Sequence, residues 1–457
     1  MSIIDLKKNS NNDLPTYSLR RVFQGASIFS IGEVLIKSST FFLIPLYTRF
    51  LTPEDYGIIG YLQVFFQVGT VLLAFGFYGA QTLYYYENRN DKIALGEFYF
   101  SINIVQIVIG LLFLIPVSVM GFVFNWSFGL SGIPFYPLLN IAMWTVLFQV
   151  LAQNVISFYQ AQQKYTITTL LQIGLFFLVT GLTILLIVGF TWGVLGQVTG
   201  LFLGTMLFTF FTYWTYLKHF SWKISFRALK YAAAFGAPVA INTLAAVIHN
   251  VFDRIILEGF VTMDELGIYT LGFSIGSALN MFIMAFNQAY QPMYFQLMST
   301  NREDKEYQII RTFKVWLIMM TAIAMIGIIF GGPFLKVFVG PRFVATIHVF
   351  PWIILAVFFG SFYFFFSSAI FFFKKTKYLP IITGVSAVIN IGLNLLFIPY
   401  WGIIGSAKAT VISHIVQSLF TLIASDRLYR IRWPAGLIVF CMGAVTLAVF
   451  IAGVFSW

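Results

Sequence analysis

Residues 51–58 read LTPEDYGI, and 210 positions later residues 261–268 read VTMDELGI. A second pair of similar segments has nearly the same spacing, because WGVLG at residues 192–196 recurs as WGIIG at residues 401–405, 209 positions further on. Similar segments at nearly one offset indicate that the chain contains two copies of one unit. In membrane proteins, such internal copies usually meet around a transport path.

The composition is that of a membrane protein. Hydrophobic residues make up 59% of the chain and charged residues 9%, whereas ordinary soluble domains hold about 25% charged residues. The apolar residues fall in long continuous runs, each near the ~20 residues that cross a bilayer as a helix, and they lack the alternation of barrel strands. We therefore expect thirteen membrane-spanning helices, centred near residues 35, 69, 110, 147, 178, 205, 242, 278, 320, 357, 389, 413 and 445.

The distribution of positive charge orients the chain. If the polar N-terminal segment lies inside, the inside segments hold 21 of the 27 Lys and Arg residues. Basic residues are thus concentrated in every second loop, which fits the positive-inside rule and predicts a multi-pass protein with a cytoplasmic N-terminus. The net charge of +11 then reflects topology. Nucleic acid is not an expected partner, because the basic residues are spread over short loops rather than gathered on one face.

The chain offers few groups for covalent or metal chemistry. Cys441 is the only cysteine and lies inside the last expected span, so an internal disulfide is excluded and a thiol-based site is not indicated. The four histidines are scattered, and the sequence contains no recognisable nucleophile–histidine–acid set, phosphate loop or metal-ligand spacing. We expect no cofactor, no bound metal and no enzymatic activity.

Each copy contains six expected spans, and because six is even, both copies have the same orientation. The sequence thus predicts an all-α integral membrane protein with two parallel six-helix repeats, twelve helices in all, plus one accessory C-terminal transmembrane helix. We expect a V-shaped bundle around a central cavity. The expected parts are a cytoplasmic N-terminal segment (1–21), a first half (22–217), a cytoplasmic linker (218–230), a second half (231–424), and a basic loop with the accessory helix (425–457).

Several ionisable side chains fall within expected spans, where they are costly and usually face the bundle interior or water. Glu33 and Lys37 are four residues apart in the first span and so share one helical face. Such residues either form buried ion pairs that fix helix packing or line a charged central cavity. The others are His249, Asp253 and Arg254 in and beside the seventh span, and Lys408 in the twelfth.

Amide side chains recur at helical spacing in four of the expected spans. Interhelical hydrogen bonds, worth ~0.6 kcal/mol each on average, explain such residues adequately. Recognition of sugars is the alternative, because an amide offers both a donor and an acceptor to a hydroxyl group. The amides that we select as candidates for a polar lumen are Gln63, Gln149, Asn280 and Asn287.

Longer motifs point to a family. The LTPEDYGI segment at 51–58 resembles the pattern after the first helix in the polysaccharide-transport family, within the multidrug/oligosaccharidyl-lipid/polysaccharide exporter superfamily. DRIIL at 253–257 followed by ELGIY at 265–269 resembles the start of that family's second half. NIGLN at 390–394 and IPYWGIIG at 398–405 resemble its eleventh and twelfth helices. The resemblance covers essentially the whole chain, although family members commonly have twelve or fourteen spans rather than thirteen.

The resemblance implies a flippase that carries an undecaprenyl-pyrophosphate-linked oligosaccharide from the cytoplasmic to the outer face of the membrane, for O-antigen, capsule or exopolysaccharide synthesis. It also implies a bacterial cytoplasmic (inner) membrane location, contact with membrane lipids, and a polysaccharide polymerase with its chain-length machinery as partners. The alternatives are a lipid II flippase, a multidrug extruder, and a non-transporting membrane protein of glycan assembly.

The implied mechanism is alternating access around the cavity between the halves. In this hypothesis Lys37, Arg254 and Lys408 supply countercharge to the pyrophosphate, and the four candidate amides replace water around the sugars. Coupling or charge-pairing roles fall to Glu33, Asp253 and His249.

Overall fold

The computed structural model describes residues 35–36, 38–39, 41–124, 127–128, 133–300 and 303–454. Within these ranges the chain is almost entirely helical, as expected from the continuous apolar runs. Glu33 and Lys37 lie outside the described residues.

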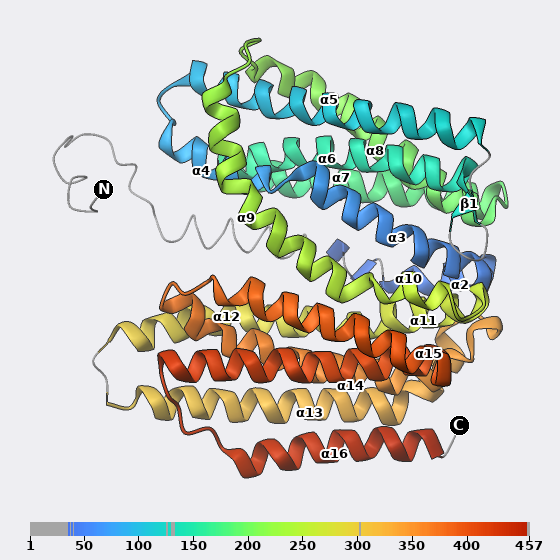
Figure 1. Ribbon diagram of the computed structural model, residues 1–457, viewed down its shortest axis with the longest axis vertical. Helices are drawn as coiled ribbons and strands as arrows, with labels where there is room; N and C mark the ends of the chain where they lie inside the picture. Colours follow the sequence, from blue (N-terminus) through green and yellow to red (C-terminus); the bar gives the residue numbers. More distant parts are fainter. Residues whose placement is uncertain are drawn as a thin grey trace.

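Residues 53–216 form the upper lobe in Figure 1, and residues 44–50 lie at its border with the lower lobe. The helices of this part are α2 (Ile44–Phe50), α3 (Pro53–Ala74), α4 (Phe77–Glu87), α5 (Lys92–Val123), α6 (Asn140–Ala161), α7 (Tyr165–Ile184) and α8 (Gly193–Tyr216). Between α5 and α6, the short strands β1 (Ser127–Phe128) and β2 (Ile133–Pro134) pair antiparallel.

The remainder forms the lower lobe and the helix that crosses to it (Figure 1). Its helices are α9 (Phe226–Val251), α10 (Asp253–Glu258), α11 (Met263–Ser277), α12 (Leu279–Ser299), α13 (Lys305–Phe338), α14 (Thr346–Phe372), α15 (Tyr378–Leu428) and α16 (Ala435–Val454).

The number of membrane spans is consistent with the expectation. Eleven helical segments of the described chain are long and apolar enough to cross a membrane. One of them, α15, has 51 residues and a non-helical kink at Gly402, so it accounts for the two spans expected near residues 389 and 413. The span expected near residue 35 falls largely outside the described residues.

The duplicated LTPEDYGI and VTMDELGI segments form the same local structure. In the first copy, the backbone N–H of Asp55 donates to the Thr52 hydroxyl, and the Asp55 carboxylate accepts from the Thr52 N–H. In the second copy, Thr262 and Glu265 make the same pair of bonds. These reciprocal capping boxes satisfy N–H groups that the first turn of a helix leaves unpaired, so each segment begins a helix, α3 or α11.

The two copies meet at their shared glycine. A Cβ atom on Gly57 would lie 2.9 Å from the carbonyl carbon of Met263, and one on Gly267 would lie 2.7 Å from the carbonyl carbon of Pro53. Met263 and Pro53 are themselves equivalent positions, so the contact is reciprocal, as around a two-fold axis. Because neither position has room for a side chain, the duplicated glycine permits α3 and α11 to cross backbone to backbone.

The second duplicated motif also keeps its conformation. Gly193 has φ +54° and Gly402 has φ +51°, in the left-handed region that favours glycine. Three residues later in each copy, a Cβ on Gly196 would lie 3.0 Å from the carbonyl carbon of Leu186, and one on Gly405 would lie 2.5 Å from the carbonyl oxygen of Phe397. The motif therefore turns the chain sharply and lets the next helix pack closely on the one before it.

Helix α9 crosses between the lobes (Figure 1). Its middle lies against the junction of α3 and α4, because a Cβ on Gly236 would lie 3.3 Å from the carbonyl carbon of Phe75 and closer to its oxygen. Its C-terminal end contacts α15 of the lower lobe, where His249 lies beside His414. The accessory helix α16 packs on α13 and α14 at the far edge of the lower lobe.

Candidate functional site

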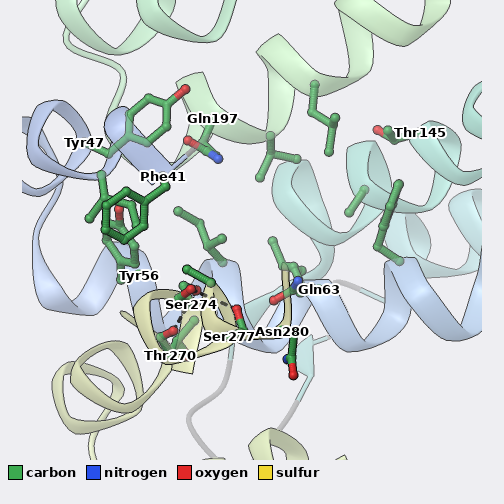
Figure 2. Close-up of a pocket in the computed structure, with 18 of the residues that line it drawn as sticks. Phe41, Tyr47, Tyr56, Gln63, Thr145, Gln197, Thr270, Ser274, Ser277 and Asn280 are labelled. Carbon is green, nitrogen blue, oxygen red and sulfur yellow. Dashed lines mark hydrogen bonds between the residues drawn. The ribbon is translucent and has the colours of Figure 1, made fainter. Parts of the chain in front are cut away.

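A cavity of about 710 Å³ lies between the two lobes. The upper lobe and its border contribute residues of α2, α3, α6 and α8, and the lower lobe contributes residues of α11 and α12 (Figure 2). This volume is within the range of ~300–1,000 Å³ that is typical of small-molecule sites. The polar residues that line the cavity are Tyr47, Tyr56, Gln63, Thr145, Gln197, Thr270, Ser274, Ser277 and Asn280.

The lower-lobe wall of the cavity is a row of hydroxyl groups on α11. The Ser274 hydroxyl donates to the carbonyl oxygen of Thr270 at 2.8 Å, and the Ser277 hydroxyl donates to that of Ser274 at 2.8 Å. Because a hydroxyl has one proton and two lone pairs, each serine oxygen can still accept a hydrogen bond from the cavity. The row follows from a spacing of four and three residues, which places side chains on one helical face.

Amide groups complete the polar lining. Gln63 on α3 is exposed, Asn280 on α12 is half-buried, and both face the space between the lobes (Figure 2). Gln197 on α8 has a buried side-chain oxygen with no hydrogen-bond partner. An amide provides two donors and one acceptor oxygen, so these side chains can replace water around a neutral, hydroxyl-rich molecule.

The lining that the structure describes contains no Lys, Arg, Asp or Glu. The rest of the wall is apolar and aromatic, including Phe41, Phe66 and Met284. The described cavity therefore offers hydrogen-bonding groups and apolar faces to a neutral molecule. It presents no carboxylate for an organic cation.

Two of the four candidate amides, Gln63 and Asn280, line the cavity. Gln149 lies half-buried on α6, and Asn287 lies half-buried on α12 with its side-chain oxygen unpaired; neither lines the cavity. The sequence reasoning missed Thr145, Gln197 and the α11 hydroxyls. The spacing of Thr270, Ser274 and Ser277 was the signal that could have identified that wall.

Arg254 lies in the lower lobe, away from the cavity lining, and it is 2% exposed. Its Nη1 atom is 3.6 Å from Oδ1 of Asp253, and its guanidinium lies 4.9 Å from the centre of the Phe273 ring. The Tyr269 hydroxyl donates to the other oxygen of Asp253, and the Ser406 hydroxyl donates to Tyr269 at 3.3 Å. The two charges therefore form a buried pair that fastens α10 to α11 and α15.

Lys408 lies in an aromatic pocket. Its Nζ atom is 4.1 Å from the centre of the Trp401 ring and 5.1 Å from that of Trp352. Such cation–π contacts hold an ammonium group through the electron-rich faces of the rings. In this conformation Arg254 and Lys408 are engaged with protein groups, and the substrate-binding roles assigned to them and to Lys37 stay predictions.

A second set of buried amides holds the upper lobe together. The Asn154 amide donates to Oδ1 of Asn103 at 2.8 Å and to Oε1 of Gln106 at 2.7 Å. The Tyr213 hydroxyl also donates to Oδ1 of Asn103. These side chains join α5, α6 and α8 inside the lobe, so amides in this protein serve helix packing as well as the cavity.

Comparison with known proteins identifies the family. The family model described as "Polysaccharide biosynthesis protein" matches residues 46–348. Two Haemophilus influenzae proteins are similar over most of the chain. An uncharacterized membrane protein is 24% identical, covering 84% of this chain and 94% of its own length. Lsg locus putative protein 1 is 23% identical, covering 87% and 98%.

Solved structures share the fold. The lipid II flippase MurJ, in an inward closed conformation, has a TM-score of 0.72 at 16% identity, covering 94% of this chain and 93% of that chain. An inward-facing multidrug resistance MATE family transporter has a TM-score of 0.68 at 15% identity, covering 92% and 99%. The chain therefore belongs to the polysaccharide biosynthesis protein family and is a multi-pass, all-α membrane protein with the fold of these transporters.

Proposed function

We propose that the protein is a flippase that moves a lipid-linked oligosaccharide across the membrane by alternating access of the cavity between its lobes. The observation that carries this proposal is the cavity itself, which lies between the two copies of the duplicated unit and has hydroxyl and amide groups on both sides. Family membership supports a role in polysaccharide biosynthesis. The protein acts as a carrier, not as an enzyme.

The chemistry of the lining supports a sugar as cargo. A hydroxyl group that loses water without gaining a hydrogen bond costs several kcal/mol, roughly 2–7 depending on the reference state. Gln63, Gln197 and Asn280 offer donors and acceptors in place of water, and the α11 hydroxyls offer further acceptors. The polyisoprenoid tail stays in the bilayer, because it is as apolar as the lipid.

The pyrophosphate needs countercharge during passage. We assign this role to Lys37, as the sequence suggests, with Arg254 and Lys408 contributing after they exchange their present partners. For Arg254 the exchange means leaving Asp253, and for Lys408 it means leaving the faces of Trp352 and Trp401. The phosphate groups would supply the replacement negative charge.

Close contacts at one end of the lobes support alternating access. Beyond the crossing at Gly57 and Gly267, the Gly340 N–H donates to the Thr48 hydroxyl at 3.0 Å. The rings of Tyr56 and Phe343 meet edge to face at 5.0 Å. With the N-terminus in the cytoplasm, as the positive-inside rule predicts, this closed end faces outward. The structure is then an inward-oriented state, the orientation described for both similar structures.

In this proposal the moving halves correspond to residues 22–217 and 231–424, joined by the cytoplasmic linker 218–230, and residues 425–457 add the accessory helix. We place the protein in the inner membrane of a bacterium. Its partners are membrane lipids, the lipid-linked glycan, and a polymerase with its chain-length machinery.

Transport by matched cavity variants tests the proposal. Gln63→Leu and Asn280→Leu remove cavity amides at similar volume, and Gln296→Leu changes an exposed amide on the same helix as Asn280. In proteoliposomes that contain a fluorescent lipid-linked oligosaccharide, we expect the two cavity variants to slow flipping at least about tenfold, the cost of one or two lost hydrogen bonds. The Gln296 variant keeps the parent rate.

Equal rates for all three variants would refute the assignment of the cavity. Loss of flipping in the Gln296 variant would assign the effect to folding instead. Competition separates the alternatives: an excess of lipid II blocks flipping of the labelled glycan if the protein is a lipid II flippase, and organic cations block it if the protein is a multidrug extruder. A non-transporting protein gives no flipping above empty vesicles.

A further inference from the structure

A buried histidine and a half-buried one meet where the crossing helix α9 joins the lower lobe. Nε2 of His249 on α9 lies 3.4 Å from Nδ1 of His414 on α15, and the rings are nearly perpendicular with centres 4.9 Å apart. The same Nδ1 atom lies 3.3 Å from Oε1 of Gln417, whose amide donates to Thr383 at 3.4 Å. His249 is 4% exposed.

Only one proton fits between the two facing ring nitrogens. A neutral imidazole carries one N–H. When Nδ1 of His414 carries its proton, that N–H faces the oxygen of Gln417 and the lone pair on Nε2 of His249, and His249 bonds the backbone of Ser386. A second proton on Nε2 of His249 would set two N–H groups against each other at this contact.

The pair lies at a mechanically important point. Helix α9 contacts the upper lobe at Gly236 and Phe75, and His249 lies about four turns further along the same helix. The contact between His249 and His414 therefore fastens the crossing helix to the lower lobe. Any change that loosens it alters how the two lobes are tied together.

Protonation is such a change. Histidine is the side chain whose charge ordinarily changes between about pH 5 and 8. An imidazolium at the buried His249 is largely cut off from the water that stabilises charge, and two imidazolium rings would repel each other at short range. A proton therefore binds more tightly to a conformation in which the rings have separated and reached water, and it shifts the population toward that conformation.

Other charged groups lie on the elements packed around the pair, and several already have partners. Asp253 contacts Arg254 and Tyr269, and Lys408 lies over Trp352 and Trp401. Among the described residues of α14, Tyr363 bonds Thr383, which is the hydrogen-bond partner of Gln417.

We infer that His249 and His414 form a proton-binding site whose occupation releases α9 from α15 and opens the closed end of the lobes. The inference rests on the proposed function only for its purpose, which is to couple glycan movement to a proton gradient. The conformational change itself needs no glycan.

A spin-label pair across the closed end tests the inference. Glu54 and Asp264 are equivalent exposed positions at the starts of α3 and α11, and the Cys441→Ser background removes the native thiol. With labels at Glu54→Cys and Asp264→Cys in lipid nanodiscs and a metal chelator present, we expect the close-pair population in the dipolar spectrum to fall more than about threefold from about pH 8 to pH 5.

His249→Gln and His414→Gln should abolish this response, because glutamine keeps hydrogen bonding without gaining charge. His348→Gln, on an exposed part of α14, should leave it unchanged. A pH-independent spectrum in the parent protein overturns the inference even if the variants fold poorly, and so does an undiminished response in both paired-histidine variants. If the pH response follows the two histidines but no glycan moves, the proposed function fails and the proton site stands.

Discussion

Replacing Gly267 by alanine should separate the lobes at the point where they come closest. The added Cβ would lie 2.7 Å from the carbonyl carbon of Pro53 and 2.9 Å from the nitrogen of Gly57, whereas ordinary contacts are 3.4–4 Å. Both neighbours are backbone atoms of a helix, so the strain is relieved only by moving α3 about 1 Å away from α11. Overpacking of this kind costs ~1–3 kcal/mol.

The clash destabilises the closed conformation without destabilising either lobe, so it shifts the equilibrium between the closed and open conformations. At about 1.4 kcal/mol per factor of ten, the closed population relative to the open one should fall about 5- to 150-fold. The spin labels at positions 54 and 264 measure this directly as a loss of the close-pair signal. Gly57→Ala should act alike, because its contacts are the reciprocal ones.

Gly174→Ala is the matched control. Gly174 lies in α7, and a Cβ there would meet nothing within 4 Å, so this variant gains the same ~1 kcal/mol of helix propensity without the clash. The reasoning is wrong if Gly267→Ala and Gly174→Ala give the same dipolar spectrum, because the backbone crossing would then have no bearing on which end is closed.

Two further predictions concern the closed end and the buried ion pair. With Cys441→Ser as background, Glu54→Cys together with Asp264→Cys places exposed thiols on both sides of the closed end; joining them with a reductant-cleavable bis-maleimide should stop glycan flipping and a reductant should restore it, and unimpaired flipping by a fully cross-linked sample would exclude movement at this end. Arg254→Met leaves the Asp253 carboxylate buried without its partner, so we expect a loss of ~3–5 kcal/mol in stability, measured as a lower thermal midpoint in detergent. Asp253→Asn in the same chain should recover part of that loss, and a midpoint unchanged by Arg254→Met would show that the pair contributes nothing.

The duplication was the part of the architecture most accessible from sequence. Residues 51–58 and 261–268 predicted two copies of one unit. In the structure both segments begin helices, and their shared glycine is where the copies touch, because only glycine allows two backbones to approach so closely. The apolar runs also predicted two spans near residues 389 and 413, on either side of the kink at Gly402 in α15. Hydropathy did not predict that these two spans form one continuous 51-residue helical segment.

The site was predicted only in part, for a physical reason. Gln63 and Asn280 line the cavity, whereas Lys408 meets Trp352, a residue far earlier in the chain on another helix. The sequence reveals that a charged side chain lies in a span. Because a charge inside the membrane is costly, it needs a partner group there. It does not reveal which neighbouring helix supplies that partner, because the partner depends on how the helices are rotated against one another.

Helix α9 belongs to the second copy in the sequence but packs against the first copy in the structure. Residues 218–230 separate the two copies along the sequence, yet α9, which begins within them, is seated against Phe75 of the preceding copy. A protein divided at residue 222 would leave the first fragment without the contact that Gly236 of α9 makes with Phe75 at the end of α3. A protein divided after Val251 would give a first fragment that keeps this contact, and this is the division at which separately synthesised pieces should reassemble best.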